Sequence, residues 1–111
     1  HSAGDQMIAN FARILRKVVP AKDFVGRYGV DEFIAVIYDT DKEHVQEILN
    51  QLQEEVEQFN VNRKSIPISF AQGWGISTDY KECTLRTLFD KADYYMYENK
   101  QKTKAGRKDT V

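Results

Sequence analysis

Two apolar segments on either side of a short acidic turn constrain the fold of this chain more than any other feature. Residues 23–28 and 33–38 contain valine, isoleucine, phenylalanine and tyrosine, and the turn between them reads Gly29-Val30-Asp31-Glu32. Two such segments around a glycine-containing turn predict a β-hairpin. The second segment is apolar on both faces, which is typical of an inner strand of a covered sheet. We therefore expect a sheet built around this hairpin.

Three amphipathic helices are predicted around the hairpin. Their apolar residues recur at intervals of three and four, as expected for helices that bury one face. Each follows a residue whose short polar side chain can cap a helix. The predicted helices are Gln6–Val19 with Asp5 as its cap and Pro20 after its end, Lys42–Phe59 with Asp41 as its cap, and a third helix capped by Thr84, with Leu85, Leu88, Phe89, Ala92 and Met96 facing inward.

A third strand is predicted between the last two helices. Ile66, Ile68 and Phe70 alternate with other residues, and the segment continues to Ile76. Pro67 fits the start of a strand, and the glycines further on indicate a bend or a close approach of the backbone. A ferredoxin-like sheet has the order strand, helix, strand, strand, helix, strand. This chain opens on a helix, so the first strand of such a sheet is absent from it.

Composition excludes several classes of protein. The net charge is −1, so the chain has no overall basic field for nucleic acid or for a membrane surface. Cys83 is the single cysteine, which excludes an intramolecular disulfide and leaves no cysteine partner for zinc. No apolar run approaches the roughly 20 residues that cross a bilayer, and no signal peptide is recognisable. We expect a single cytoplasmic domain over residues 1–111, although its parent protein could be attached to a membrane.

Candidate chemical groups lie in the turn and near the C-terminus. Asp31 and Glu32 offer hard oxygen ligands of the kind that hold Mg²⁺ against phosphates. Basic residues gather between Lys100 and Lys108, which indicates either an anion site or a complement to a helix dipole. Taken alone, an acidic pair at a turn is more often simply solvated, and Asp5 can cap a helix whatever else it does.

Four segments in this order resemble the GGDEF domain, the diguanylate cyclase family. Residues 1–5 are similar to the family's His-x-x-Gly-Asp element, and residues 27–33 are similar to its signature, with Val30 where the family has its second glycine. Residues 68–75 resemble the later Ser-x-Gly strand, and residues 88–100 resemble the terminal helix with its Ala-Asp, Tyr and Lys pattern. The resemblance therefore covers the whole chain.

The resemblance implies an α/β (α+β) fold of the palm-like, nucleotidyl cyclase type, with a ferredoxin-like sheet flanked by helices. The missing first strand would carry the family's other metal-binding aspartate. The resemblance further implies a domain that binds GTP with two divalent cations, Mg²⁺ or Mn²⁺. In an antiparallel homodimer, two such domains join two GTP molecules into cyclic di-GMP. The parent would be a bacterial signalling protein with a sensor or a phosphodiesterase domain.

The family's functional residues transfer to the positions of this chain that match its motifs. Asp31 would be a metal ligand, and Glu32 would lie beside the metals and the attacking ribose hydroxyl, where it could serve as a general base. Asp5 would contact the edge of guanine, and Gly29 would let the nucleotide lie against the turn. The triphosphate would be contacted by Lys100 and by Lys104 or Arg107.

Two departures from the family's pattern favour a degenerate domain. A two-residue hairpin turn often needs a positive φ, which a β-branched residue adopts only with strain, so Val30 is expected to impair turnover. The methyl groups of Val30 would also stand where the family's bare backbone meets the nucleotide. The family's inhibitory Arg-x-x-Asp site survives only as Asp23, since Pro20 replaces the arginine and Lys22 is at the wrong place to substitute for it. This predicts weak or absent binding of cyclic di-GMP there.

Three functions are compatible with the residues. The first is a degenerate GTP-binding module that regulates or dimerises its parent protein. The second is an active diguanylate cyclase that tolerates the valine. The third is a partner-binding domain without nucleotide, against which the joint retention of Asp5, Asp31, Glu32 and Lys100 argues.

Overall fold

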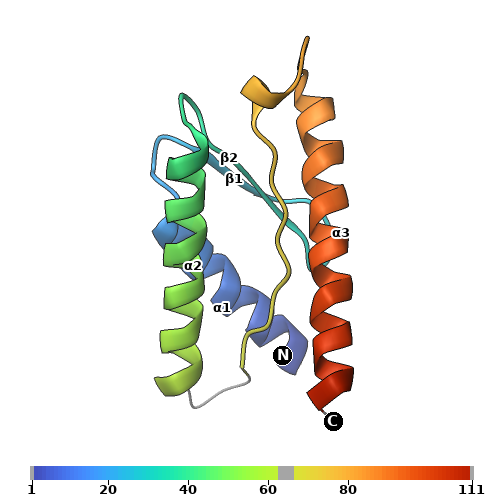
Figure 1. Ribbon diagram of the computed structural model, residues 1–111. Coiled ribbons are helices and arrows are strands. Elements are labelled where there is room, and N and C mark those ends of the chain that lie inside the picture. The colour runs from blue at the N-terminus through green and yellow to red at the C-terminus, as the bar shows by residue number, and fades with distance from the viewer. Residues whose placement is uncertain (1, 63–66, 111) are drawn as a thin grey trace. The chain divides into compact units, whose positions relative to one another are not determined.

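A computed structural model describes residues 2–62 and 67–110, with side chains as far as residue 101. The elements follow in the order α1 (Ala3–Val18), β1 (Phe24–Arg27), β2 (Phe33–Val36), α2 (Lys42–Asn62), a 3₁₀ turn (Ser77–Asp79) and α3 (Leu85–Thr110) (Figure 1). This confirms the predicted α+β class. The chain divides into two compact units, His1–Ile68 and Ser69–Val111. None of the described helices is both long enough and apolar enough to cross a membrane.

The first unit contains the hairpin and the first two helices. β1 and β2 pair antiparallel, from Phe24 opposite Val36 to Arg27 opposite Phe33, which confirms the predicted hairpin with somewhat shorter strands. α1 contacts α2, and Phe11 of α1 packs on Phe33 with ring centroids 5.6 Å apart. The buried apolar side chains of this unit are Leu15, Val18, Val19, Leu52, Val56 and Ile68.

The start of α1 differs from the prediction. The helix begins at Ala3, and the hydroxyl of Ser2 accepts a hydrogen bond from the Asp5 backbone N–H at 3.1 Å. Ser2 is therefore the cap, because a short hydroxyl side chain satisfies the free N–H in the first turn. The expectation that Asp5 caps the helix was wrong. Asp5 lies within the first turn, where its negative charge complements the helix dipole.

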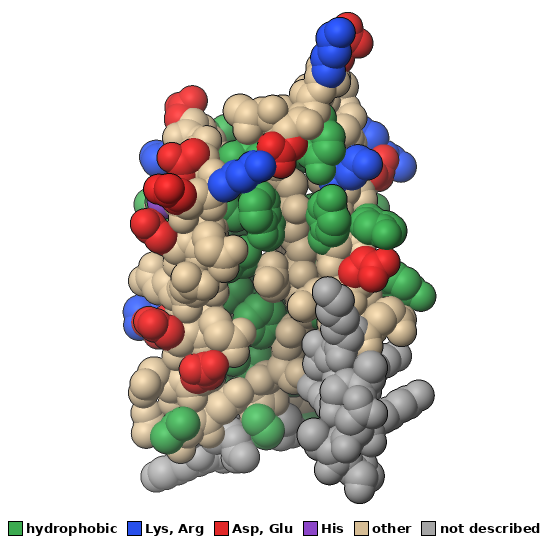
Figure 2. Space-filling view, viewed as in Figure 1, with side chains coloured by type: hydrophobic (Ala, Val, Ile, Leu, Met, Phe, Trp, Pro, Cys, Tyr) green, Lys and Arg blue, Asp and Glu red, His purple; other side chains and the backbone are tan. Residues whose placement is uncertain are grey.

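The caps of the other two helices are confirmed. The Asp41 carboxylate accepts a hydrogen bond from the His44 N–H at 2.8 Å, and the Thr84 hydroxyl accepts one from the Thr87 N–H at 3.1 Å. α2 continues to Asn62, three residues past the predicted end at Phe59, because residues 60–62 include no proline or glycine that would end a helix. Figure 2 shows acidic side chains spread along α2, whose exposed glutamates include Glu43, Glu47, Glu54 and Glu57.

The predicted third strand is not formed in the described residues. Residues 67–76 belong to no sheet, and Ile66 lies outside the described residues. Within the second unit, Gly73 lies directly against the backbone of α3, and the Gln72 N–H donates a hydrogen bond to Asn99 Oδ1 at 3.1 Å. A strand needs a neighbouring strand as well as an alternating pattern. Residues 72–73 have a helix as their neighbour instead.

The inward face of α3 is confirmed except at its first residue. Leu88, Phe89, Ala92 and Met96 are half-buried, whereas Leu85 is 67% exposed. Leu85 begins the helix one turn before Leu88 and Phe89, so its side chain extends beyond the packed face.

Candidate functional site

The loop between β1 and β2 is held by hydrogen bonds at its base and at its tip. At the base, the N–H groups of Tyr28 and Gly29 donate to the Glu32 carbonyl oxygen at 2.9 and 3.4 Å. Nearer the tip, the Arg27 guanidinium donates to the Gly29 carbonyl oxygen at 3.1 Å and to the Val30 carbonyl oxygen. The acidic residues thus belong to a loop with a defined shape.

The backbone of Val30 adopts its conformation in this loop without strain. Among the described residues, a positive φ occurs only at Asp39 and Glu82. The loop spans residues 28–32 and is longer than the two-residue turns that require a positive φ. The expectation of strain at Val30 was therefore wrong. Val30 is 78% exposed, so most of this residue's surface is open to solvent.

The two carboxylates of the loop suit a metal ion that arrives with a phosphate ligand. Asp31 is exposed and Glu32 is half-buried. The Glu32 side chain lies over Gly29, where an added Cβ would be 3.7 Å from the Glu32 Cβ. No group of three or more His, Cys, Asp or Glu residues in the described part of the chain could hold a metal ion. Mg²⁺, however, is commonly held by one or two carboxylates, with phosphates and water as its other ligands.

An open pocket of about 250 Å³ lies between α1 and the hairpin. Its apolar side chains come from α1 and from Phe33, while Asp5 contributes a carboxylate acceptor and Arg27 a guanidinium donor. Apolar walls with a few polar groups are typical of small-molecule sites. The residues that line this pocket are Asp5, Ile8, Ala9, Ala12, Arg27 and Phe33.

Arg27 links the pocket to the acidic loop, because it lines the first and donates to two carbonyl oxygens of the second. No function was expected for Arg27 from the sequence. Its position as the last residue of β1, directly before the loop, is the signal that could have identified it.

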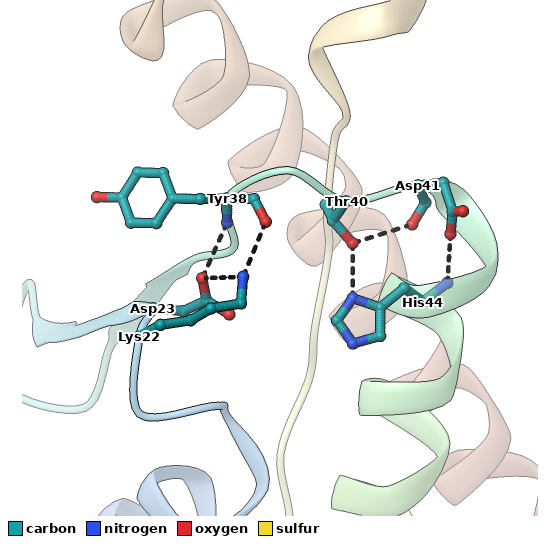
Figure 3. Close-up of polar contacts among 6 residues, drawn as sticks. All are labelled: Lys22, Asp23, Tyr38, Thr40, Asp41 and His44. Atoms are coloured by element: carbon teal, nitrogen blue, oxygen red, sulfur yellow. Dashed lines mark hydrogen bonds and ion pairs between the residues drawn. The ribbon is translucent and has the colours of Figure 1, made fainter.

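Asp23, expected as the remnant of an inhibitory site, lies just before β1 and is hydrogen-bonded to Tyr38, which follows the end of β2 (Figure 3). Its Oδ1 accepts hydrogen bonds from the Tyr38 N–H at 3.0 Å and from the Lys22 ammonium at 3.3 Å, and Lys22 also donates to the Tyr38 carbonyl oxygen at 3.2 Å. The hydrogen bond from Tyr38, opposed by desolvation and assisted by Lys22, lowers the pKa of the Asp23 carboxyl. Oδ1 of the carboxylate is therefore already engaged within the protein.

The basic residues expected to contact a triphosphate lie on α3, in the second unit. Lys100 is exposed there. Lys104 and Arg107 belong to the same helix, but their side chains lie outside the described residues. Contact of these three residues with a phosphate remains a prediction.

Comparison with known proteins gives consistent matches over almost all of the chain. The family model described as "Diguanylate cyclase, GGDEF domain" matches residues 1–106. The chain is 29% identical over 107 residues to Diguanylate cyclase DgcP of Pseudomonas aeruginosa, a match that covers 96% of this chain and 16% of that protein. It is 24% identical over 102 residues to Diguanylate cyclase A of Treponema denticola, covering 91% of this chain and 28% of that protein.

A third similar protein is Signaling protein YkoW of Bacillus subtilis. The identity is 31% over 127 residues, covering 100% of this chain and 15% of that protein. The chain thus spans less than a third of the length of each of these relatives. No solved structure shows a significant match.

Proposed function

This chain belongs to the GGDEF family of diguanylate cyclase domains, and we propose that its first unit binds GTP together with Mg²⁺ or Mn²⁺. The observation that carries the proposal is the pocket beside α1, which is lined by both Asp5 and Arg27. Arg27 also donates a hydrogen bond to the acidic loop. A base site and a metal-phosphate site would then be neighbours in one unit.

The residues supply the polar groups that such a ligand requires. Guanine presents two N–H donors on its Watson–Crick edge, which a single carboxylate such as that of Asp5 can accept. Adenine presents a nitrogen acceptor there, so the pocket favours guanine. Asp31 and Glu32 would hold the metal, which when bound would neutralise the phosphate charges. Lys100, with Lys104 or Arg107, would add positive charge at the triphosphate.

Isothermal titration with GTP in the presence of Mg²⁺ tests this assignment. The double variant Asp31→Ala with Glu32→Ala should lose binding. The matched control is Glu47→Ala with Glu54→Ala, which removes the same charge from exposed positions on α2 and should bind as the parent chain does. Unchanged affinity in the loop variant would contradict the metal site.

We propose further that the domain acts as a regulatory or dimerisation module within a larger cytoplasmic signalling protein. A homodimer, and a sensor or phosphodiesterase domain in the parent, are parts of this proposal. The lengths of the relatives support it, since each is several times longer than the matched segment.

Active diguanylate cyclase is the second candidate, and the relaxed backbone of Val30 favours it. The test is incubation at high protein concentration with GTP and Mg²⁺, with the products separated by chromatography. Formation of cyclic di-GMP, with Glu32 as the candidate general base for the ribose hydroxyl, would make the domain an enzyme. Unchanged GTP that protects the protein against thermal unfolding would support the regulatory module. A gain of turnover in Val30→Gly would mean that the valine side chain, rather than backbone strain, obstructs the reaction.

A further inference from the structure

We propose that Arg27 is a positioning residue that fixes the shape of the acidic loop for metal and nucleotide, an inference that rests on the proposed function. Arg27 is the last residue of β1 and pairs with Phe33, the first residue of β2. Its backbone is therefore anchored in the ladder, while its side chain reaches the loop. Nε donates to the Gly29 carbonyl oxygen at 3.1 Å, and Nη2 donates to the Val30 carbonyl oxygen.

A guanidinium suits this task better than any other cation. Its donors lie in one rigid plane and can contact two acceptors at once, whereas a lysine ammonium is a compact charge on a flexible stem. The two acceptors here belong to consecutive residues, so one planar group fixes the orientation of two peptide units. The loop therefore does not depend on a second glycine for its shape, which explains how Val30 is accommodated.

Asp31 and Glu32 lie between two constraints. Arg27 holds the carbonyl oxygens just before them, and the N–H groups of Tyr28 and Gly29 hold the Glu32 carbonyl oxygen. When metal-coordinating side chains belong to a loop that is already ordered, metal binding does not carry the entropic cost of ordering that loop. Metal binding should therefore weaken when the constraint from Arg27 is removed.

The charge of Arg27 alone predicts the opposite effect. A cation close to two carboxylates repels a divalent metal ion, so its removal would strengthen metal binding if charge were all that mattered. Arg27→Ala and Arg27→Lys together separate the two effects. Both lose the fork of donors, but only the alanine variant loses the charge.

Hydrogen exchange in the free protein tests the loop directly and needs no ligand. In Arg27→Lys and Arg27→Ala, the amides of Tyr28 and Gly29 should exchange about tenfold faster, while the strand amides stay within about twofold. Arg13→Lys, whose arginine donates to Asn10 on α1, is the control and should leave the loop unchanged. Unchanged loop amides, or equal acceleration throughout the hairpin, would overturn the inference.

Binding of Mn²⁺ in the presence of GTP, followed by electron paramagnetic resonance, tests the link to function. Arg27→Lys should bind about tenfold more weakly, as expected for the loss of a charge-assisted contact. Arg27→Ala should also bind more weakly but by a smaller factor, because the loss of its charge offsets part of the effect, and Arg13→Lys should bind normally. Stronger binding in Arg27→Ala with normal binding in Arg27→Lys would mean that charge alone acts, against the inference. If the parent chain bound no Mn²⁺ and GTP, the proposed function would fail, and hydrogen exchange would still decide whether Arg27 holds the loop.

Discussion

Replacement of Gly73 by alanine should disrupt the packing of the second unit. A Cβ built on Gly73 would overlap the backbone nitrogen of Met96 and the carbonyl oxygen of Ala92, and would lie 2.7 Å from the carbonyl carbon of Tyr95. These are backbone atoms inside α3, so they cannot move aside as the end of a flexible side chain can. The segment that contains Gly73 must instead move away from the helix.

The expected loss of stability has two parts. Forcing one extra methyl group into a packed contact costs about 1–3 kcal/mol. Movement of the segment also breaks the hydrogen bond from the Gln72 N–H to Asn99 Oδ1, which contributes about 1 kcal/mol. The free energy of unfolding should therefore fall by about 2–4 kcal/mol, which corresponds to a Tm lower by about 8–16 °C for a chain of this size.

Urea unfolding of Gly73→Ala beside Gly75→Ala measures this effect. A Cβ on Gly75 would lie 3.5 Å from Lys91 Cβ and 3.6 Å from Leu88 Cδ2. These are ordinary contacts, so this control should change stability by less than about 1 kcal/mol. Neither glycine has a positive φ, so backbone conformation cannot explain a difference. Equal stability of the two variants would refute the close packing of Gly73 on α3.

Three further substitutions test other features. Because the pKa of Asp23 is lowered from 3.8, its carboxylate stabilises the fold above that pH, and this contribution is lost as the pH falls from 3.8 through the lowered pKa. The free energy of unfolding in urea, measured between about pH 6 and about pH 2, should therefore depend less on pH in Asp23→Asn. Equal pH dependence in the variant and the parent would contradict the contact with Tyr38. Val30→Gly should lower the free energy of unfolding by up to about 1 kcal/mol, because no strain is relieved and the unfolded chain gains freedom; a rise on chemical denaturation would show hidden strain. Thr84→Ala should cost about 1 kcal/mol through loss of the cap on α3, and unchanged helix content and stability by circular dichroism would refute that cap.

The hairpin and the helices could be predicted because their causes are local. Alternating or periodic apolar residues define each element, and the cap at Thr84 uses a residue type that competes well for its position. The cap of α1 was misassigned because Ser2 and Asp5 both suit an N-cap, and only the helix register decides between them. Residues 67–76 were misassigned because a strand depends on a neighbour that the local sequence does not specify.

The candidate site was predictable in its residue types and less so in its geometry. The acidic loop could be predicted directly from the residue types of Asp31 and Glu32. Asp5 lines the pocket beside this loop. The backbone strain expected at Val30 is absent, because the hydrogen bonds that close the loop run from Tyr28 and Gly29 to Glu32. The loop is therefore longer than a tight two-residue turn. Arg27 was missed because its partners are backbone carbonyl oxygens, whose orientation cannot be read from residue types, and only its place directly before the acidic loop pointed to it.

The most direct test of the GTP site is a nuclear magnetic resonance titration of the ¹⁵N-labelled chain with GTP in the presence of Mg²⁺. The largest amide shifts in the first unit should fall in two groups, one at Asp5 and the following turn of α1 and the other in the loop 28–32, and ATP should produce much smaller shifts at α1. Absence of shifts at millimolar GTP, or shifts in this unit confined to residues outside these two groups, would contradict a nucleotide site on this hairpin.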